Sequence, residues 1–128
     1  MITAIDSSIL LDIATNDSQY GLPSANAIKL ARSDGRLIVC ELVVAEITPV
    51  CGAQTSLFLS SICVDFVPSS KRSSLQAGQM FSDYVARGGK RGRIVADFLI
   101  GAHAVEHAGR LLTRDDGFLR DYSPQGLI

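Results

Sequence analysis

Four acidic residues occupy positions from which a folded chain could gather them for metal chemistry. Asp6 directly follows a short apolar segment, and Asp115 follows another after one intervening residue. Glu46 lies one helical turn behind Glu41 in a helix-type segment. Asp97 lies among apolar residues, where an acid is costly to bury without a partner or a cation. Of the four acids, Asp97 is therefore the hardest to explain as an ordinary surface residue.

Converging carboxylates have a defined chemistry. Held within about 4–6 Å of one another, they repel, and some stay protonated unless a cation neutralises them. Mg²⁺ is a hard cation that takes one or two carboxylates together with waters and phosphate oxygens. Such an ion makes bound water a stronger nucleophile, and a pair of ions can brace both oxygens of an in-line displacement at phosphorus. Taken singly, an Asp after a strand is more often a helix cap or a solvated loop residue, and a Glu on a helix usually lies on a solvated face.

Short apolar segments alternate with longer segments of helical period, and this alternation defines the elements that must position the acids. The predicted strands are 2–5, 37–40, 63–67 and 111–113, with 127–128 as a candidate fifth. The first predicted helix is capped by Ser7 or Ser8 and runs through Ile9, Leu10 and Ile13. The later predicted helices cover 23–33, 41–50, 54–61, 74–86 and 94–108, with a turn at 116–120. In the second helix Ala27, Ile28, Leu30 and Ala31 are expected to face inward.

Helices between strands that are apolar throughout indicate an α/β fold with a mostly parallel sheet. Ligands of open parallel sheets bind outside the carboxyl ends of the strands. Asp6 and Asp115 follow predicted strand ends, and Glu46 and Asp97 lie on helices next to such ends. The topology therefore predicts that the four acids converge at one edge of the sheet.

Size and charge restrict the class of protein. A chain of 128 residues with 47% hydrophobic residues is predicted to form a single domain, residues 1–128, with a real core. The formal net charge of −1 argues against a protein that grips nucleic acid by overall positive charge. Any nucleic-acid function must then come from a local patch and a specific site.

The cysteines and the N-terminus favour a soluble cytoplasmic protein without a membrane partner. Cys40, Cys51 and Cys63 are odd in number and lack C-x-x-C spacing, so three buried, reduced thiols are expected. The first residues reach Asp6 without the basic region of a signal peptide. No apolar run approaches the roughly 18–20 residues of a membrane span.

Four short motifs resemble those of PIN domains. The first is Ala4-Ile-Asp-Ser-Ser-Ile-Leu10, the second Val44-Ala-Glu-Ile47, the third Val95-Ala-Asp-Phe-Leu-Ile-Gly-Ala-His-Ala104 and the fourth Leu111-Leu-Thr-Arg-Asp115. Their order and spacing, and the length of the chain, are similar to those of VapC-type toxins, the ribonuclease halves of bacterial toxin–antitoxin pairs. The resemblance covers essentially the whole chain.

The resemblance implies a three-layer α/β/α sandwich and an endoribonuclease that hydrolyses RNA with Mg²⁺ or Mn²⁺. The implied catalytic residues are Asp6, Glu46, Asp97 and Asp115, of which Asp6, Asp97 and Asp115 bind metal. Ser8 and Thr113 are implied as hydroxyls that support the acids. The family is usually dimeric and is neutralised by a small antitoxin.

Two positions depart from the family pattern. Cys40 stands where a small hydroxyl residue is common. Asp116 doubles the last acid, so either Asp115 or Asp116 could be the ligand, and Asp115 is our choice.

A glycine-rich basic segment precedes Asp97. It reads either as a solvated loop or as a grip on the RNA backbone that delivers a polyanion to an acidic pocket. The candidate RNA-binding residues are Arg87, Lys90, Arg91 and Arg93, with Arg114 as a further one.

The string His103-Ala-Val-Glu-His107 matches the H-x-x-E-H pattern of one class of zinc peptidases. His103 lies six residues after Asp97, which is about 120° around a helix, so the two do not share a site. A solvated helix face is the favoured interpretation of both histidines.

Two rival functions fit the sequence less well. Phosphotransfer on an aspartate fits poorly, because the position of a D-x-D motif holds Asp6-Ser-Ser8, Asp65 lies inside its strand, and no lysine follows Lys90. The second rival is a catalytically inactive PIN-like domain that only binds RNA or a partner. That alternative predicts the loss of an acid, and all four are present.

Overall fold

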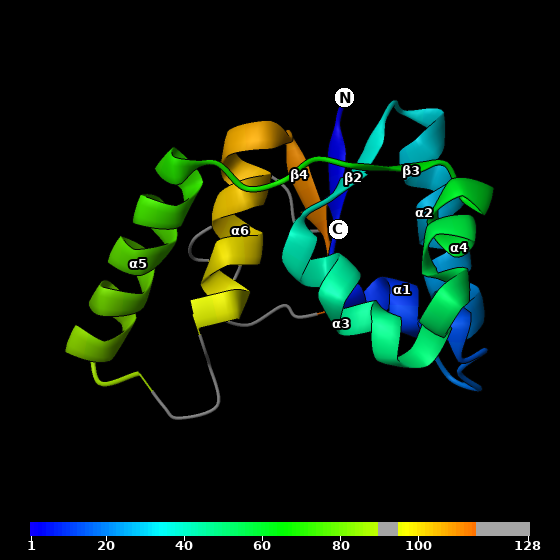
Figure 1. Ribbon diagram of the computed structural model, residues 1–128, viewed down its shortest axis with the longest axis horizontal. Coiled ribbons are helices and arrows are strands. Elements are labelled where there is room, and N and C mark those ends of the chain that lie inside the picture. Colours follow the sequence, from blue (N-terminus) through cyan, green and yellow to red (C-terminus); the bar gives the residue numbers. More distant parts are fainter. Residues whose placement is uncertain (90–94, 115–128) are drawn as a thin grey trace.

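The computed structural model describes residues 1–89 and 95–114. Within these ranges four short strands form a parallel sheet of order β3-β2-β1-β4. The strands are β1 (Thr3–Ile5), β2 (Leu37–Val39), β3 (Val64–Phe66) and β4 (Arg110–Leu112). Helices α5 and α6 lie on one side of the sheet and α2 and α4 on the other, which confirms the three-layer α/β/α architecture (Figure 1).

The helices follow the predicted order, with ends displaced by up to three residues. They are α1 (Ser7–Ala14), α2 (Gly21–Ser33), α3 (Glu41–Cys51), the 3₁₀ turn η1 (Gly52–Gln54), α4 (Thr55–Ser61), α5 (Lys71–Ala86) and α6 (Val95–His107). The largest difference is at α5, which begins at Lys71. Ser70 and Ser73 form a reciprocal capping box there, and this extends the helix toward its N-terminus. The predicted turn at 116–120 and the strand at 127–128 lie outside the described residues.

Helix α1 is capped by the acid that ends the preceding strand, and the prediction of Ser7 or Ser8 as the cap was wrong. Asp6 has an extended backbone and its Oδ1 accepts a hydrogen bond from the Ser7 amide at 2.8 Å. Ser7 and Ser8 are the first residues of the helix itself. A carboxylate at a helix N-terminus is stabilised by the helix dipole, so the strand-to-helix junction fixes Asp6 at the edge of the sheet.

The main core surrounds the two middle strands. Every residue of β1 and β2 is buried, as expected for a parallel sheet covered on both faces. Strand β3 departs from the predicted apolar pattern, because Asp65 and Phe66 are exposed. This strand lies at the edge of the described sheet and pairs only with β2 there.

One expected core residue of α2 faces solvent. Ile28 and Ala31 are buried as predicted, whereas Leu30 is 70% exposed. Residues three apart share a helix face, and a residue two positions from Ile28 points to the opposite side. Once Ile28 and Ala31 define the inward face, Leu30 is turned outward.

Helices α5 and α6 share a second, smaller hydrophobic cluster. Its buried members are Ala77, Met80, Phe98 and Ala102. His103 of α6 is only 1% exposed, and its Nε2 lies 2.7 Å from the carbonyl oxygen of Val67. The prediction of a solvated face was therefore wrong for His103, which ties α6 to the segment leaving β3.

The three cysteines are free, but only Cys40 is buried, while Cys51 is half-buried and Cys63 is exposed. The expectation of three buried thiols was wrong. Burial raises the pKa of the Cys40 thiol, which keeps that thiol protonated.

The segment Glu41–Ser61 is, by length and composition, apolar enough to cross a membrane, contrary to our expectation that no segment would be. This is weak evidence for a span, because the segment is not one straight helix. It consists of α3, η1 and α4, with a positive φ of 58° at Gly52, and α3 packs against α4. It also carries the charged residues Glu41 and Glu46.

Candidate active site

The Asp6 carboxylate is held by donors from both sides of the strand end. Its Oδ1 accepts from the Ser7 amide at 2.8 Å. Its Oδ2 accepts from the Ser8 hydroxyl at 3.0 Å and from the Thr113 hydroxyl at 2.6 Å. These bonds fix the orientation of the carboxylate.

Sheet register brings Thr113 to Asp6 although 107 residues separate the two. Strands β1 and β4 pair in parallel with Ile5 opposite Leu112, so the residue after each strand lies at the same edge. The Asp6 amide donates to the Leu112 carbonyl at 2.9 Å, which extends the pairing by one step. The hydroxyls predicted to support the acids, Ser8 and Thr113, therefore both contact the first of them.

Ser7 lies between two of the predicted acids. Its hydroxyl is 3.1 Å from Oε1 of Glu46 and 3.5 Å from Oδ1 of Asp6. Sequence reasoning considered Ser7 only as a helix cap and missed this contact. Glu46 lies 39 residues away on another helix, and α1 packs against α3 only in the folded chain.

The pKa of the Glu46 carboxyl is raised above its usual range. Loss of hydration is the largest cause, and the charges of Asp6 and Asp97 raise it further, while the Ser7 hydrogen bond opposes them. Glu46 is exposed as a residue, but its hydrogen bond to Ser7 is partly buried. The charges of Asp6 and Asp97 thus both disfavour the charged form of Glu46.

Asp97 lies in the first turn of α6 and is half-buried. Its effect on Glu46 places it within electrostatic range of that carboxyl, and α3 packs against α6. The first turn of a helix favours negative charge because of the helix dipole. A third predicted acid, from a third element, is therefore near the same edge of the sheet.

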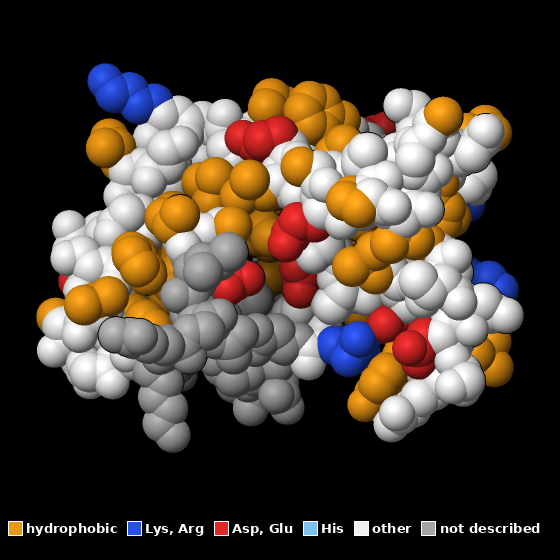
Figure 2. All heavy atoms as spheres, turned by 60° about the horizontal axis from the view of Figure 1, so that its bottom comes forward, with side chains coloured by type: hydrophobic (Ala, Val, Ile, Leu, Met, Phe, Trp, Pro, Cys, Tyr) orange, Lys and Arg blue, Asp and Glu red, His pale blue; other side chains and the backbone are white. Residues whose placement is uncertain are grey.

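The donor set suits a hard cation. Asp6, Glu46 and Asp97 offer only oxygen atoms, which is the ligand type that Mg²⁺ and Mn²⁺ prefer. Figure 2 shows acidic side chains near the middle of one face, with hydrophobic side chains around them. Within residues 1–89 and 95–114, however, no three acidic, histidine or cysteine side chains are close enough to form a complete metal site. The fourth predicted acid, Asp115, and its neighbour Asp116 lie outside these ranges.

Arg114 has a partner that the sequence did not reveal. Its Nε and Nη2 donate to the two carboxylate oxygens of Asp12, at 2.6 and 3.0 Å. Its guanidinium carbon lies 4.0 Å from the centre of the Tyr20 ring. A signal for Asp12 existed, because this acid stands between Ile9 and Ile13 on the inward face of α1.

The remaining predicted RNA-binding residues lie at or beyond the end of α5. Arg87 is exposed and caps that helix at its C-terminus. Lys90, Arg91 and Arg93 lie outside the described residues. Their role in RNA binding stays a prediction.

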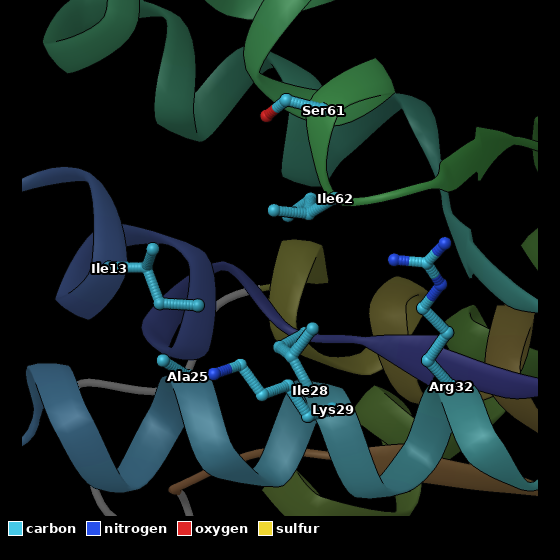
Figure 3. A pocket seen from close by; sticks show the side chains of 7 residues that line it. All are labelled: Ile13, Ala25, Ile28, Lys29, Arg32, Ser61 and Ile62. Atoms are coloured by element: carbon cyan, nitrogen blue, oxygen red, sulfur yellow. The ribbon is translucent and has the colours of Figure 1, made fainter.

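Two pockets lie outside the acidic edge. One, of about 310 Å³, is next to it and is lined by Thr113 and Arg114 together with residues of α1 and α2. The other, of about 220 Å³, lies between α2 and the end of α4, with Ile13, Ile28 and Ile62 facing into it (Figure 3). Lys29 and Arg32 line the same pocket, so it combines an apolar interior with positive charge.

A parallel sheet with oxygen-donor side chains gathered at its carboxyl edge defines an α/β domain that binds ligands at that edge. The model of the PIN domain family matches residues 3–122. The chain therefore belongs to the PIN domain family. Among curated proteins, none matches the chain.

Solved structures share the fold over its whole length. VapBC2 from Rickettsia felis, bound to a promoter DNA fragment, matches with a TM-score of 0.77 and 18% identity, over 100% of this chain and 98% of that one. VapBC-1 from nontypeable Haemophilus influenzae matches with a TM-score of 0.70 and 19% identity, over 100% and 97%. VapC20 from Mycobacterium tuberculosis, described as a sarcin–ricin loop cleaving toxin, matches with a TM-score of 0.61 and 13% identity, over 93% of each chain. At these identities the likeness concerns the fold.

Proposed function

We propose that this protein is a Mg²⁺- or Mn²⁺-dependent endoribonuclease, the toxin of a VapBC-type toxin–antitoxin pair. The observation that carries the proposal is the position of the Ser7 hydroxyl between Asp6 and Glu46, with Asp97 close enough to raise the pKa of Glu46. Membership of the PIN domain family supports it, as does the fold shared with VapBC toxins.

In this proposal Asp6, Asp97 and Asp115 hold the cation, and the hydroxyls of Ser8 and Thr113 keep Asp6 oriented. The cation, when bound, supplies a polarised water and neutralises charge on the phosphate. The pKa of Glu46 is raised above its usual range, which makes its carboxyl a better proton acceptor, so in this proposal Glu46 accepts the proton lost by water.

The reaction is a hydrolysis at phosphorus. The water oxygen forms a new bond to phosphorus while the bond to the leaving ribose oxygen breaks, and that oxygen gains a proton. Because water is the nucleophile, the neighbouring 2′-hydroxyl is not consumed. The products should therefore carry no 2′,3′-cyclic phosphate, and a cyclic end would point to a different chemistry.

The direct test compares cleavage of single-stranded and structured RNA with and without Mg²⁺ or Mn²⁺. We expect cleavage that needs the metal and that Asp97→Asn reduces by at least about a hundredfold, since the neutral amide binds a hard cation poorly. Asp65→Asn is the matched control and should cleave RNA like the wild type. Asp65 is an exposed acid on strand β3, where it pairs with Arg36. Cleavage without added metal, or an Asp97→Asn variant as active as the wild type, would refute the mechanism.

The proposal includes partners. VapBC2 and VapBC-1 are toxin–antitoxin complexes by name, and we infer that this chain likewise binds a small cognate antitoxin, forms a homodimer and acts in the cytoplasm. The pocket in Figure 3 is the candidate surface for the antitoxin, since its apolar interior with Lys29 and Arg32 suits an amphipathic segment that carries acidic residues.

One observation favours a second candidate, a PIN-like domain that binds RNA or a partner without cutting. The described residues do not by themselves complete a metal site. Titration of the protein with Mn²⁺ in the absence of RNA distinguishes the two functions. An active nuclease binds the ion through its carboxylates, and a binding-only domain does not.

A further inference from the structure

Asp12 is a buried acid that the proposed chemistry does not use. It is 4% exposed and lies on α1. Three donors bond to it, namely Nε and Nη2 of Arg114 and the hydroxyl of Ser24 at 2.7 Å. The Arg114 side chain is 39% exposed, so the pair joins a buried acid to a partly solvated cation, and these bonds offset the cost of removing the Asp12 charge from water.

Arg114 is joined to Asp6 through two hydroxyl groups. The Arg114 amide donates to the Ser8 hydroxyl at 3.3 Å, and that hydroxyl donates onward to Oδ2 of Asp6 at 3.0 Å. The residue before it, Thr113, donates to the same oxygen at 2.6 Å. A hydroxyl that accepts one bond still has its hydrogen for another, so this chain of donors is complete.

We propose that the Asp12–Arg114 ion pair positions the Asp6 carboxylate, and that Arg114 is a positioning residue and not a contact to RNA. The inference rests on the proposed function, because it concerns the same acid. The pair anchors the end of β4 to α1, and the segment it anchors carries the donors that orient Asp6.

The geometry of the guanidinium argues against a side-on phosphate contact. The bidentate bond to Asp12 occupies Nε and one donor of Nη2, which form the side edge of the guanidinium. Tyr20 covers one face of the guanidinium, and the Tyr20 amide itself donates to Asp17 at 2.8 Å. A phosphate that took the side edge would have to displace a buried carboxylate, which would then be left without its charged partner.

Two substitutions separate the interpretations by the sign of their effect. Asp12→Asn weakens the ion pair but leaves the guanidinium in place, whereas Arg114→Gln removes the guanidinium itself. For a positioning role we expect each variant to lower kcat by about tenfold and to weaken binding of Mn²⁺ alone by a similar factor. The KM for RNA and its salt dependence should stay unchanged. If Arg114 instead binds RNA, Arg114→Gln raises the KM and reduces the salt dependence of RNA binding by the amount expected for one lost phosphate contact. Asp12→Asn then lowers the KM, because the guanidinium is free to bind RNA. That pattern would overturn the proposal.

A milder pair of variants keeps the test valid if the buried substitutions prevent folding. Tyr20→Leu removes the ring that covers Arg114, whereas Tyr20→Phe keeps it and loses only a hydroxyl bonded to Gln19. We expect a lower kcat and weaker Mn²⁺ binding for the leucine variant alone. Arg36→Gln, which breaks the exposed pair with Asp65, is the control for loss of an arginine.

The outcomes also distinguish this inference from the proposed function. A wild-type chain that binds Mn²⁺ but cuts no RNA would overturn the proposed function, and the Mn²⁺ titration of the variants would still decide the role of Asp12. A wild-type chain that binds no Mn²⁺ overturns both. Active variants with unaltered kcat and unaltered Mn²⁺ binding overturn the positioning role alone.

Discussion

At the scale of single residues, the site is a set of carboxylates whose orientation depends on short hydroxyl side chains. Ser7, Ser8 and Thr113 each contact Asp6, and Ser7 also contacts Glu46. Such supporting contacts fix the rotamer of a ligating group and tune its basicity. Their removal should therefore be visible in activity while the acids themselves stay intact.

Thr113→Val tests the support of Asp6 with an almost isosteric change. The substitution removes the 2.6 Å donor to Oδ2 and leaves the packing of the β4 end nearly unchanged. We expect cleavage to slow by about tenfold, with weaker binding of Mn²⁺. Thr15→Val is the control, because the Thr15 hydroxyl donates to the Leu11 carbonyl on the exposed side of α1. Full activity in the Thr113 variant would contradict the role given to the hydroxyl.

Glu46→Gln tests the raised pKa of that carboxyl. In the folded chain Glu46 holds its proton to a higher pH than in the unfolded chain, so stability is lost as the pH rises from its usual pKa through the raised one. We expect Glu46→Gln to melt at a higher temperature than the wild type at neutral pH, and the difference to close in acid. Thermal melts from pH 4 to 8 measure this effect.

Addition of Mn²⁺ should reverse the order of the two melting temperatures at neutral pH, because the cation relieves the repulsion among the wild-type carboxylates. A variant that melts like the wild type at every pH, with and without Mn²⁺, would show that Glu46 is not under strain from its neighbours.

At the scale of elements, the parallel sheet brings the carboxyl ends of its strands to one edge. Parallel pairing places Asp6 after β1 beside Thr113 after β4. Helix α3 contributes Glu46 and α6 contributes Asp97, and both helices contact each other. The segment that joins α5 to α6 precedes Asp97 in the chain and carries a cluster of positive charge in its sequence.

Neutralising that segment should weaken RNA binding and leave metal binding intact. We expect RNA to bind more weakly to a variant in which four residues are changed to Ala, namely Arg87, Lys90, Arg91 and Arg93. The slope of the logarithm of the binding constant against the logarithm of the salt concentration should also become shallower, by about 0.7 for each phosphate that is no longer neutralised. Binding of Mn²⁺ alone should match the wild type. The measurement is RNA affinity at several salt concentrations from low to physiological. If its salt dependence is the same in the variant and the wild type, the segment is a solvated loop that does not contact RNA.

At the scale of the whole molecule, charge and exposed apolar surface divide the protein into an acidic edge and a separate pocket. The pocket of Figure 3 is lined from α1, α2 and the end of α4, which gives a partner room to bind away from the acids. Helices α2 and α4 also carry exposed apolar side chains, including Leu22, Leu30 and Leu57.

Ala25→Glu tests that surface as the antitoxin site. Ala25 lines the pocket and is half-buried, so a glutamate can reach solvent without breaking the core. We expect it to weaken binding of the proposed cognate antitoxin by at least about tenfold, through bulk and repulsion of acidic groups, while RNA cleavage stays unchanged. Leu75→Glu, an exposed position on α5, is the control. Isothermal titration with the purified antitoxin measures the effect, and equal affinities would exclude the pocket.

Local patterns in the sequence specify the order and type of the elements and the positions of the acids along them. Hydrophobic period and strand-end placement are local properties, so the parallel sheet and the approach of Asp6, Glu46 and Asp97 could be predicted from them. A helix cap was only the alternative interpretation of Asp6, and the early start of α5 was missed, because side-chain caps shift a helix end within the limits that the hydrophobic pattern allows.

Which side chains became partners depended on packing between distant segments. Asp12 and Arg114 are 102 residues apart, and His103 reaches Val67 across 36 residues, so neither contact leaves a trace in local period. Each depends on how distant helices and strands pack in three dimensions, and burial then favours the pairing, because an unpaired buried charge or polar atom is costly. That is why Arg114 reads as a surface cation in the sequence and as an anchored one in the fold.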